Sequence, residues 1–500
     1  MKKLLIANRG EIAVRIISTA KEMGIATVAV YSEADQHSMH VACADEAVYI
    51  GGSAPAESYL RMEAIIDAAK TTGADAIHPG YGFLSERAEF SALCASNGIE
   101  FIGPPEAAMR ALGGKIEAKQ IAVQNNVPIT LGFFEPGATP EQLFAEAKKI
   151  GFPVMLKASA GGGGRGMRAV FDESEFMSAC TMASDEATNA FGDGTMMVEK
   201  LVKTPRHVEV QIVADKHGNV APLFERECSI QRRHQKLIEE SPAPYFDRKN
   251  IWDAMRDAAV NLAKGSGYYG AGTVEFIVDP ESGEFYFMEV NARLQVEHPV
   301  TEGVTDLDLV RLQIEIARGK SLVDLAPQFI AGDRANLRGH CLEVRIVAED
   351  PAKNFLPCIG KIIGWAEPKS PGVRVDTGYS AGSEVSRFYD SMVAKLIVTA
   401  EDRSAAITRT IRALKDFHVL GVKTNIPYLI SVLEHPGFKS GDIDTGFLGR
   451  EFEDWAPNAE LPQELGSLMM LAKGTKAKQS ASVADPSPAW STQDSWRVVR

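Results

Sequence analysis

Short apolar runs alternate with helical periodicity over the first hundred residues of the chain. The runs "KLLIA", "ATVAVYS", "ADAIHPG" and "GIEFIGP" each have the length of one buried strand. Between the first two runs, Ile12, Ile16, Ala20 and Met23 recur at the spacing of one helix face. Strands that alternate with helices in this way predict βαβ units, in which a parallel sheet is covered by helices.

The first turn of this region argues against a nicotinamide cofactor. It reads "IANRGEIA" and contains one glycine, Gly10. A dinucleotide fingerprint needs GxGxxG there, because the glycines allow close approach of the pyrophosphate. We therefore expect a Rossmann-like sheet without the dinucleotide site.

A second pattern starts at Lys115 with the helical segment "KIEAKQIAVQNN", followed by "GFPVMLKASAGGGGRGMRAV". The latter predicts a strand, a glycine loop and a second strand. A P-loop would need GK[ST] opening a helix, and neither feature is present. The loop is expected to close over phosphates as a lid, and the alternative is an exposed flexible turn.

The remaining third of the chain predicts an antiparallel β unit followed by helices. Its apolar runs are "HCLEVRIVAEDP", "GKIIGWAEP", "GVRVDTGY" and "DSMVAKLIVTA". After about residue 450 the composition becomes rich in Pro, Ser, Lys and Gln, which is typical of a linker. Two of the five tryptophans, Trp490 and Trp496, lie in this tail and indicate docking on another surface.

Composition narrows the class of protein. Five hundred residues with 45% apolar and 24% charged positions predict a soluble globular protein of two to four domains. A net charge of -13 argues against a nucleic-acid partner. The six cysteines form no CxxC pair, so we expect neither a zinc site nor disulfides. Reduced thiols of this kind indicate a reducing, cytoplasmic compartment. No apolar stretch approaches the roughly 18 residues of a membrane span.

Two acidic residues in "GTVEFIVDPESGEFYFMEVNARLQVEHPVTE" are candidate metal ligands. Glu275 and Glu289 lie on apolar strand-like segments joined by a Pro/Gly turn, so a hairpin would place them side by side, with Asn291 two residues further on. Carboxylate and amide oxygens are ligands that Mg²⁺ prefers. Arg293, Glu297 and His298 follow closely as a cation and potential bases. The alternative is a polar strand face in solvent.

A basic cluster and a glycine turn complete the candidate chemistry. The segment "ECSIQRRHQKLIEE" places four basic residues within five positions, namely Arg232, Arg233, His234 and Lys236. In an acidic protein such a cluster suits an anionic substrate, although a solvated charge run is the common alternative. The segment "HPGYGFLSE" follows a predicted strand, at a place where open α/β sheets bind ligands, and it equally fits a tight turn.

These motifs, taken together and in order, resemble the biotin carboxylase family of the ATP-grasp superfamily over roughly residues 1 to 450. The resemblance is carried by "IANRGEIAVRI", "HPGYGFLSE", "KASAGGGGRGM", "VEKLVKTPRHVEVQI", "CSIQRRHQKLIEESPAP", "GAGTVEF", "MEVNARLQVEHPVTE" and "FYDSMVAKLI". It implies an α/β fold with a Rossmann-like N-terminal domain (1–112), an ATP-grasp domain (113–330) with a lid at about 131–203, a C-terminal α+β domain (331–450) and a tail (451–500).

The resemblance also implies a reaction and a set of roles. MgATP, or MnATP, and bicarbonate would give carboxyphosphate, whose carboxyl group passes to N1′ of biotin. The residues implied for ATP are Lys115, Lys157, Gly163, Gly164, Glu199, Lys200, Leu201, Val202, His207, Gln231, His234, Glu275 and Glu289. Those implied for the metal are Glu275, Glu289 and Asn291, and those for bicarbonate are Lys236, Arg293 and the Val296 backbone.

Proton transfer and biotin binding are implied for a smaller set. Glu297 would be the general base, with Lys236, Arg293 and Arg345 as the catalytic cations. Arg345 would stabilise the biotin ureido oxygen, and Tyr81 and Gly82 would line the biotin pocket.

The chain departs from the family pattern in two places. It has Gly113-Gly114-Lys115 where the family often has Gly-Asp-Lys, and Asn291-Ala292-Arg293 where the family often has Asn-Thr-Arg. Neither change removes a proposed ligand.

No Met-Lys-Met of a biotin carrier occurs, so biotin is expected on another polypeptide or on a part absent from this sequence. The tail "DPSPAWSTQDSWR" resembles acyl-CoA carboxylase α subunits of the methylcrotonyl-, geranyl- or propionyl-CoA type. The implied partners are a biotin carboxyl carrier and a carboxyltransferase, in a homodimer or a larger hetero-oligomer. The final carboxyl acceptor is decided by that carboxyltransferase.

Two other functions stay open at this point. One is another ATP-grasp ligase that activates a carboxylate or bicarbonate, for example one like carbamoyl-phosphate synthetase. The other is a catalytically silent nucleotide-binding scaffold. The "RRHQK" and "NARLQVEHP" segments disfavour the first, and the intact set of metal, base and cation candidates disfavours the second.

Overall fold

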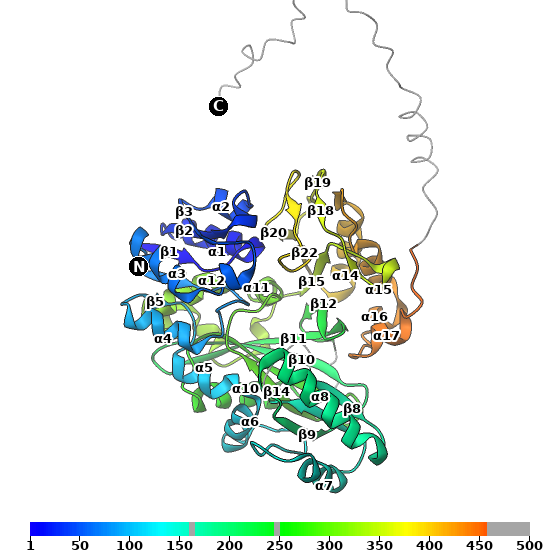
Figure 1. Cartoon of the computed structure of the whole chain (residues 1–500). Coiled ribbons are helices and arrows are strands. Elements are labelled where there is room, and N and C mark those ends of the chain that lie inside the picture. Colours follow the sequence, from blue (N-terminus) through cyan, green and yellow to red (C-terminus); the bar gives the residue numbers. More distant parts are fainter. Residues whose placement is uncertain (160–165, 245–250, 458–500) are drawn as a thin grey trace, which may run out of the picture. The chain divides into compact units, whose positions relative to one another are not determined.

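The computed structural model describes residues 1–159, 166–244 and 251–457, and Figure 1 shows the whole chain. Residues Met1–Trp455 form one compact unit. It begins with a five-stranded parallel sheet in the order β3-β2-β1-β4-β5. These strands are β1 (Lys3–Ile6), β2 (Ala26–Ser32), β3 (Glu46–Gly51), β4 (Ala76–His78) and β5 (Glu100–Phe101). The helices between and after them are α1 (Gly10–Glu22), α2 (Met39–Cys43), α3 (Met62–Thr72), α4 (Ala88–Ser96) and α5 (Glu106–Gly113).

The predicted βαβ pattern is confirmed, and its apolar helix face is buried. Ile12, Ile16 and Ala20 of α1 are at most 1% exposed. The order of the strands makes the junction of β1 and β4 the point where the sheet reverses its winding direction, and open α/β sheets bind ligands at such junctions. The Asn8 amide, after β1, donates 2.7 Å hydrogen bonds to the carbonyls of Pro79 and Tyr81, after β4, and so joins the two loops.

A small four-stranded antiparallel sheet contains the two strands predicted on either side of the glycine loop. Its order is β6 (Gly132–Phe133), β9 (Met196–Lys200), β7 (Val154–Ala158) and β8 (Met167–Val170). Strands β7 and β8 pair from Val154↔Val170 to Lys157↔Met167. The predicted helix is α6 (Lys115–Gln124), and α7 (Pro140–Ile150) and α8 (Phe176–Phe191) pack against each other and the sheet. Gly163 and Gly164 lie outside the described residues.

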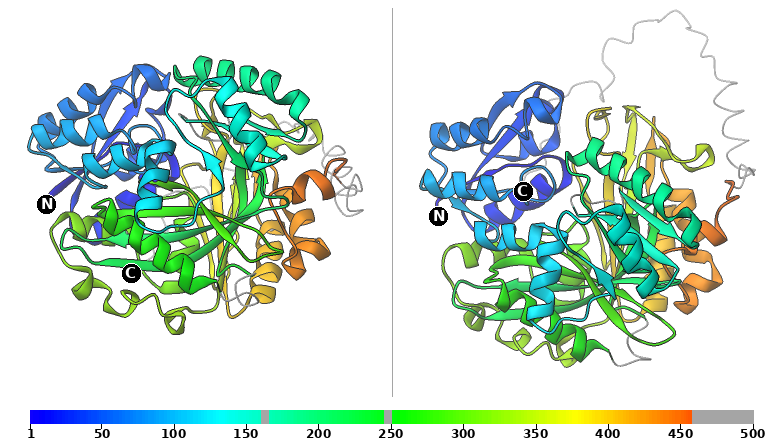
Figure 2. Two further views of the ribbon diagram at one scale, coloured as in Figure 1. Left: turned by 90° about the horizontal axis from the view of Figure 1, so that it is seen from below. Right: turned by 60° about the horizontal axis from the view of Figure 1, so that its bottom comes forward.

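The central element is an eight-stranded antiparallel sheet in the order β14-β13-β10-β11-β12-β15-β22-β20. Its strands are β10 (Arg206–Ala214), β11 (Val220–Arg232), β12 (Gln235–Ser241), β13 (Gly270–Val278), β14 (Phe285–Asn291), β15 (His340–Val347), β20 (Val373–Thr377) and β22 (Met392–Ala400). In Figures 1 and 2 it runs from the green strands to the yellow ones. Strands β12 and β15 pair from Ile238↔Val344 to Ser241↔Cys341, so the sheet continues across the boundary predicted at residue 330.

The remaining elements surround this sheet. The helices are α10 (Trp252–Gly265), α11 (His298–Thr305), α12 (Leu309–Ala317), α13 (Leu322–Leu325), α14 (Arg403–Lys415), α15 (Ile426–Glu434), α16 (Pro436–Ser440) and α17 (Phe447–Glu451). The short strands are β16 (Glu349–Asp350), β17 (Leu356–Pro357), β18 (Gly360–Lys361), β19 (Gly364–Ala366), β21 (Glu384–Val385) and β23 (His418–Leu420). Among the described residues, no helix combines the length and apolar character needed to cross a bilayer.

Candidate active site

One cleft of about 1110 Å³ is lined by the site residues that the sequence predicts. It is bordered by the loops after β1 and β4, the small sheet, the β11–β12 and β13–β14 hairpins, and β15. The predicted residues on its wall are Tyr81, Gly82, Lys115, Lys157, Glu199, Lys200, Leu201, Val202, His207, Gln231, His234, Lys236, Glu275, Glu289, Asn291, Arg293, Val296, Glu297 and Arg345. Every site residue that the resemblance implies, within the described part of the chain, therefore lines the same cavity, whereas the candidates Arg233 and His298 are not among its lining residues.

The predicted hairpin places two carboxylates side by side. Glu275 on β13 and Glu289 on β14 are register partners across the hairpin. Burial raises the pKa of Glu289, and the neighbouring charge of Glu275 raises it further. Burial acts in the same direction on Glu275, but Lys236 and His207 outweigh it and hold the pKa of Glu275 well below its usual range. Two adjacent carboxylates, of which Glu275 is buried and Glu289 half-buried, fit a hard divalent cation, which would relieve their repulsion.

Asn291, the third predicted metal ligand, lies beside the pair with its amide group already engaged. Its nitrogen donates a 2.8 Å hydrogen bond to Glu275 Oε1, and its oxygen accepts one of 2.9 Å from Arg293 Nη2. The amide would have to rotate to present its oxygen to an ion between the carboxylates. The two glutamates are therefore the better-placed part of the predicted ligand set.

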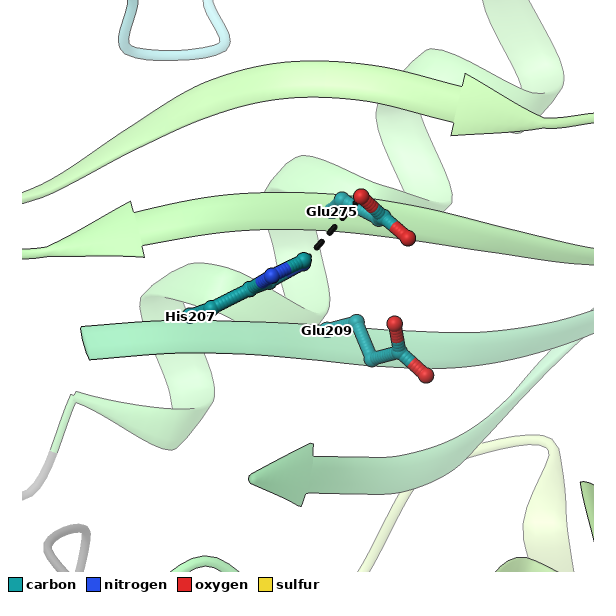
Figure 3. A group of neighbouring side chains, drawn as sticks. All are labelled: His207, Glu209 and Glu275. Carbon is teal, nitrogen blue, oxygen red and sulfur yellow. Dashed lines mark ion pairs between the residues drawn. The ribbon is translucent and has the colours of Figure 1, made fainter. Parts of the chain in front are cut away.

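Lys236 is the centre of the acidic cluster. Its ammonium lies 2.5 Å from Glu209 Oε2, 2.9 Å from Glu275 Oε1 and 2.6 Å from Glu297 Oε1. Burial lowers the pKa of Lys236, but the surrounding carboxylates outweigh it and raise this pKa well above the usual value. Figure 3 shows how His207 and Glu209 of β10 and Glu275 of β13 project from neighbouring strands, with His207 Nε2 3.1 Å from Glu275. The positive charge at the centre of this cluster is thus the lysine.

Glu297 is an ionised and fully buried carboxylate. It accepts hydrogen bonds from Lys236 at 2.6 Å and from Arg345 Nη2 at 3.0 Å. Burial alone would raise its pKa, yet Lys236 and Arg345 hold the pKa of Glu297 well below its usual range. The residue is therefore deprotonated at neutral pH, and this is the state in which a general base accepts a proton.

Arg293 is held by a partner that the sequence analysis missed. Its Nε lies 2.9 Å from Glu86 Oε2, and Glu86 Oε1 accepts a 3.0 Å hydrogen bond from the Ala292 backbone. Glu86 ends the "HPGYGFLSE" segment, so the loop after β4 fixes the loop after β14. The remaining guanidinium nitrogens bind Asn291 and Gln295.

Arg345 joins Glu297 to another residue that the sequence analysis missed. Its Nε donates a 2.6 Å hydrogen bond to Glu239 Oε1, while its Nη2 reaches Glu297. Glu239 lies opposite Glu343 in the β12–β15 register, and both side chains are fully buried. Burial raises the pKa of Glu239 to about 7, despite the attraction of Arg345.

Glu199 organises the lysines on the opposite side of the cleft. Its carboxylate lies 2.9 Å from Lys157 Nζ and 3.0 Å from Lys119 Nζ, and it accepts a 2.7 Å hydrogen bond from Thr130. Burial raises the pKa of Glu199, but Lys157 and Lys119 outweigh it and lower this pKa to about 2. Lys119 follows Lys115 by one helical turn on α6, which is the sequence signal for this additional lysine. Lys115 itself has a pKa that burial lowers.

The basic cluster of the sequence divides among several environments. Arg233 and His234 form the turn between β11 and β12 with positive φ values of 50° and 64°, and both are exposed. Arg232 lies 3.2 Å from Glu349, with its guanidinium 3.9 Å from the centre of the Phe355 ring. Among these four basic residues, Lys236 alone contacts the carboxylate cluster described above. His234 lines the cleft, and the partial desolvation of its ring there lowers its pKa.

The loop after β4 is both a tight turn and a wall of the cleft. Gly80 and Gly82 have φ values of 63° and 68°, a region that favours glycine. A Cβ on Gly80 would lie 2.9 Å from the Asn8 amide nitrogen, so the approach of the two loops also requires glycine there. The Tyr81 hydroxyl donates a hydrogen bond to Glu11 of α1. The tight turn and the loop at the ligand-binding edge of the sheet, which are the two interpretations of "HPGYG", are therefore the same loop.

Three family models match the chain in succession. They are "Biotin carboxylase, N-terminal domain" over residues 1–109, "Carbamoyl-phosphate synthase L chain, ATP binding domain" over 114–325, and "Biotin carboxylase C-terminal domain" over 343–450.

Curated relatives match over most of the chain. A biotin carboxylase of Halalkalibacterium halodurans is 50% identical over 447 residues, which cover 89% of this chain and 97% of that protein. The alpha subunit of mitochondrial methylcrotonoyl-CoA carboxylase from Dictyostelium discoideum is 46% identical, over 99% of this chain and 70% of the relative. The mouse protein of the same name is 48% identical, and the match spans 63% of its length.

Solved structures have the same fold. A biotin carboxylase from Campylobacter jejuni, described as a β-γ-ATP complex, aligns with a TM-score of 0.86 and 45% identity over 90% of this chain and 99% of that one. The biotin carboxylase domain dimer of 2-oxoglutarate carboxylase from Hydrogenobacter thermophilus, described with MgADP, ADP and bicarbonate, aligns with a TM-score of 0.86 and 44% identity. It covers 91% of this chain and 99% of that one.

Replacing Glu199 with Gln is expected to reduce the free energy of unfolding at pH 7 by about 3 kcal/mol, because two buried lysines lose their shared carboxylate. The folded-state pKa of about 2 lies below the usual 4.5. The difference between wild type and variant is therefore complete above about pH 5 and shrinks as the pH falls through 4.5 towards 2.

Urea unfolding of both proteins from pH 7 down to 3.5 measures this difference. The matched control Glu173→Gln removes an exposed carboxylate from the same small-sheet region, and its effect is expected to stay within about 0.5 kcal/mol. If the stability difference between wild type and Glu199→Gln grows on acidification, Glu199 is not the ionised partner of Lys157 and Lys119.

Proposed function

The chain belongs to the biotin carboxylase family, and from this premise we propose that it carboxylates biotin with MgATP and bicarbonate as one component of an acyl-CoA carboxylase. The observation that supports this most strongly is a single cleft. In it the ionised Glu297 meets the cations Lys236, Arg293 and Arg345 and the paired carboxylates Glu275 and Glu289. The C. jejuni structure is a β-γ-ATP complex and the H. thermophilus structure contains MgADP and bicarbonate, which agree with these substrates. The biotin carboxylase models on both sides of the ATP-binding segment favour this function over a carbamoyl-phosphate synthetase.

We place ATP between the small sheet and the β13–β14 hairpin. Lys115 and Lys157 would bind the phosphates with the backbone of Gly163 and Gly164, and the backbone of residues 199–202 would read the adenine edge. His207, Gln231 and His234 would contact the nucleotide from the opposite wall. Glu275 and Glu289, with Asn291 after rotation of its amide, would hold Mg²⁺ or Mn²⁺, which supplies neutralising charge to the phosphates when bound.

Bicarbonate would bind to Lys236, Arg293 and the Val296 N–H. All three protons of Lys236 already meet carboxylates, so bicarbonate would take over one of these hydrogen bonds. Glu297 accepts the bicarbonate proton, and the resulting oxygen attacks the γ-phosphorus as the bond to ADP breaks. Because the base is already ionised, this step needs no prior deprotonation of the protein.

Carboxyphosphate would then separate into CO₂ and phosphate, and the phosphate takes the N1′ proton of biotin so that the nitrogen attacks CO₂. Arg345 faces the negative charge that develops on the ureido oxygen. Tyr81 and Gly82 would line the biotin pocket. Glu297 then releases the bicarbonate proton to solvent, which returns the base to its ionised state, so the protons balance without a further acid.

The wider assembly is part of the same proposal. The relatives include alpha subunits of methylcrotonoyl-CoA carboxylase and one subunit of the pyruvate carboxylase of Methanothermobacter thermautotrophicus, which support a biotin carrier and a carboxyltransferase as partners. The dimer seen for the H. thermophilus domain supports a homodimer. We propose a cytoplasmic location, which suits the six unpaired cysteines, and domain boundaries near residues 112, 330 and 450.

ATP hydrolysis by the purified chain is expected to require bicarbonate and to increase when free biotin is added. Glu297→Gln is expected to slow the bicarbonate-dependent rate at least about 100-fold, because an amide cannot accept the proton, while ATP binding is retained. Coupled ADP release measures the rate, and titration with a fluorescent ATP analogue measures binding. The control Glu434→Gln changes an exposed residue and should keep the wild-type rate. Hydrolysis by wild type that ignores bicarbonate would exclude this function.

Glu289→Gln is expected to raise the Mg²⁺ concentration for half-maximal activity about tenfold or more, because one of the paired carboxylates loses its charge. A Mg²⁺ titration at saturating ATP and bicarbonate measures this. Glu284→Gln, an exposed change near the tip of the same hairpin, is the matched control. Equal Mg²⁺ requirements for wild type and Glu289→Gln would place the metal elsewhere.

A further inference from the structure

A buried lysine outside the predicted site contacts the loop after β14, which contains the proposed bicarbonate ligand Val296 and the proposed base Glu297. Lys395 lies on β22 with a fully buried side chain, and its Nζ donates a 2.6 Å hydrogen bond to the Val296 carbonyl. Val296 and Glu297 share the peptide group to which this carbonyl belongs. The cation therefore fixes the backbone directly before the proposed base.

The same ammonium reaches towards the proposed biotin pocket. Glu11 Oε1 on α1 lies 3.5 Å from Lys395 Nζ, and this oxygen also accepts the hydrogen bond of the Tyr81 hydroxyl. Tyr81 is in turn held through its backbone carbonyl by Asn8. Lys395, Glu11 and Tyr81 thus form a chain from β22, which lies next to the edge strand β20 of the eight-stranded sheet, to the loop after β4.

Two further carboxylates keep Lys395 charged and in place. Asp376 Oδ2 of β20 lies 3.9 Å from its Nζ, and Glu343 Oε2 of β15 lies 4.0 Å away. Among the described residues, neither oxygen of Glu343 has a hydrogen-bond partner, so Lys395 is the nearest described source of compensation for this buried group. The lysine is therefore bound from the sheet side as well as from α1.

Close packing holds α1 against the sheet at this point. A Cβ on Gly378, just after β20, would lie 2.6 Å from the backbone carbonyl carbon of Gly10 at the start of α1. The absence of a side chain at Gly378 lets the first turn of α1, with Glu11, approach the end of β20. The contact between Glu11 and Lys395 is thus set by backbone packing.

We propose that Lys395 is a positioning residue that couples the bicarbonate and biotin subsites, by holding the Val296–Glu297 backbone and, through Glu11, the Tyr81 hydroxyl. The proposal rests on the proposed function. Its ammonium fixes two loops that belong to different subsites, so its loss disturbs both together. Lys395 itself contacts neither substrate.

Lys395→Met tests this directly, since methionine has a similar length and no charge. The Michaelis constants for bicarbonate and for free biotin are each expected to rise at least about fivefold, because the partners of Lys395 lie at the bicarbonate and biotin subsites. The Michaelis constant for ATP is expected to stay within about twofold of wild type. Lys415→Met is the matched control, since Lys415 is 57% exposed and pairs with Glu434 on the surface. Its three Michaelis constants are expected to equal those of wild type.

Amide hydrogen exchange gives a readout that does not need activity. In Lys395→Met, the amides of residues 293–298 are expected to exchange at least about fivefold faster than in wild type, whereas those of α14 are unchanged. If the protein hydrolyses no ATP with bicarbonate, the proposed function fails, yet the exchange rates still decide whether Lys395 holds this loop.

Glu11→Met provides a second variant if Lys395→Met does not fold. It removes the acceptor of the Tyr81 hydroxyl without touching Val296, so the biotin constant is expected to rise while the bicarbonate constant does not. Bicarbonate and biotin constants within twofold of wild type in Lys395→Met, with wild-type exchange at residues 293–298, would overturn the proposal. A lower turnover number with all constants unchanged would overturn it as well, because it indicates a purely structural role. For Glu11→Met, an unchanged biotin constant is the contradictory result.

Discussion

The site depends on one ammonium group that three carboxylates share. Glu209, Glu275 and Glu297 come from separate elements, and each would be costly to bury as an anion without a partner. Lys236 lies between 2.5 and 2.9 Å from all three, so the cluster exists because the cation is there. Removing one partner from such a buried group typically costs about 3–5 kcal/mol, which ties the geometry of the site to the stability of the sheet.

The same principle extends outward from Lys236. Arg226 holds the other oxygen of Glu209 at 2.6 Å, Arg345 spans Glu239 and Glu297, and Glu86 holds Arg293. Each cation is thereby oriented by a residue from a different segment before any substrate arrives. Fixed charges that need no reorganisation are the most effective stabilisers of charge that develops during a reaction. The cations Lys236, Arg293 and Arg345 are therefore held in place by carboxylates, some of which, such as Glu275 and Glu297, line the cleft themselves.

Local patterns predict the parts of this site that are close in sequence. The Pro/Gly turn between two apolar runs is enough to pair Glu275 with Glu289, and the strand context of the glycine loop separates it from a P-loop. The partners that orient the cations are far apart in sequence, with 207 positions between Glu86 and Arg293 and 106 between Glu239 and Arg345. The Glu239–Arg345 contact depends on the strand order of the large sheet, which continues across the predicted boundary at residue 330. The Glu86–Arg293 contact joins the loop after β4 of the parallel sheet to the loop after β14. Spacing also cannot show which end of the Asn291 amide faces Glu275.

The central claim is that this arrangement of charges makes bicarbonate, rather than water, the nucleophile towards ATP. Bicarbonate labelled with ¹⁸O in all three oxygens, turned over with ATP and biotin in unlabelled water, tests this claim most directly. Because a bicarbonate oxygen would form the new bond to the γ-phosphorus, mass spectrometry of the released phosphate should find one ¹⁸O atom for each ATP consumed. Phosphate that carries no label, and so takes its new oxygen from water, would contradict the claim.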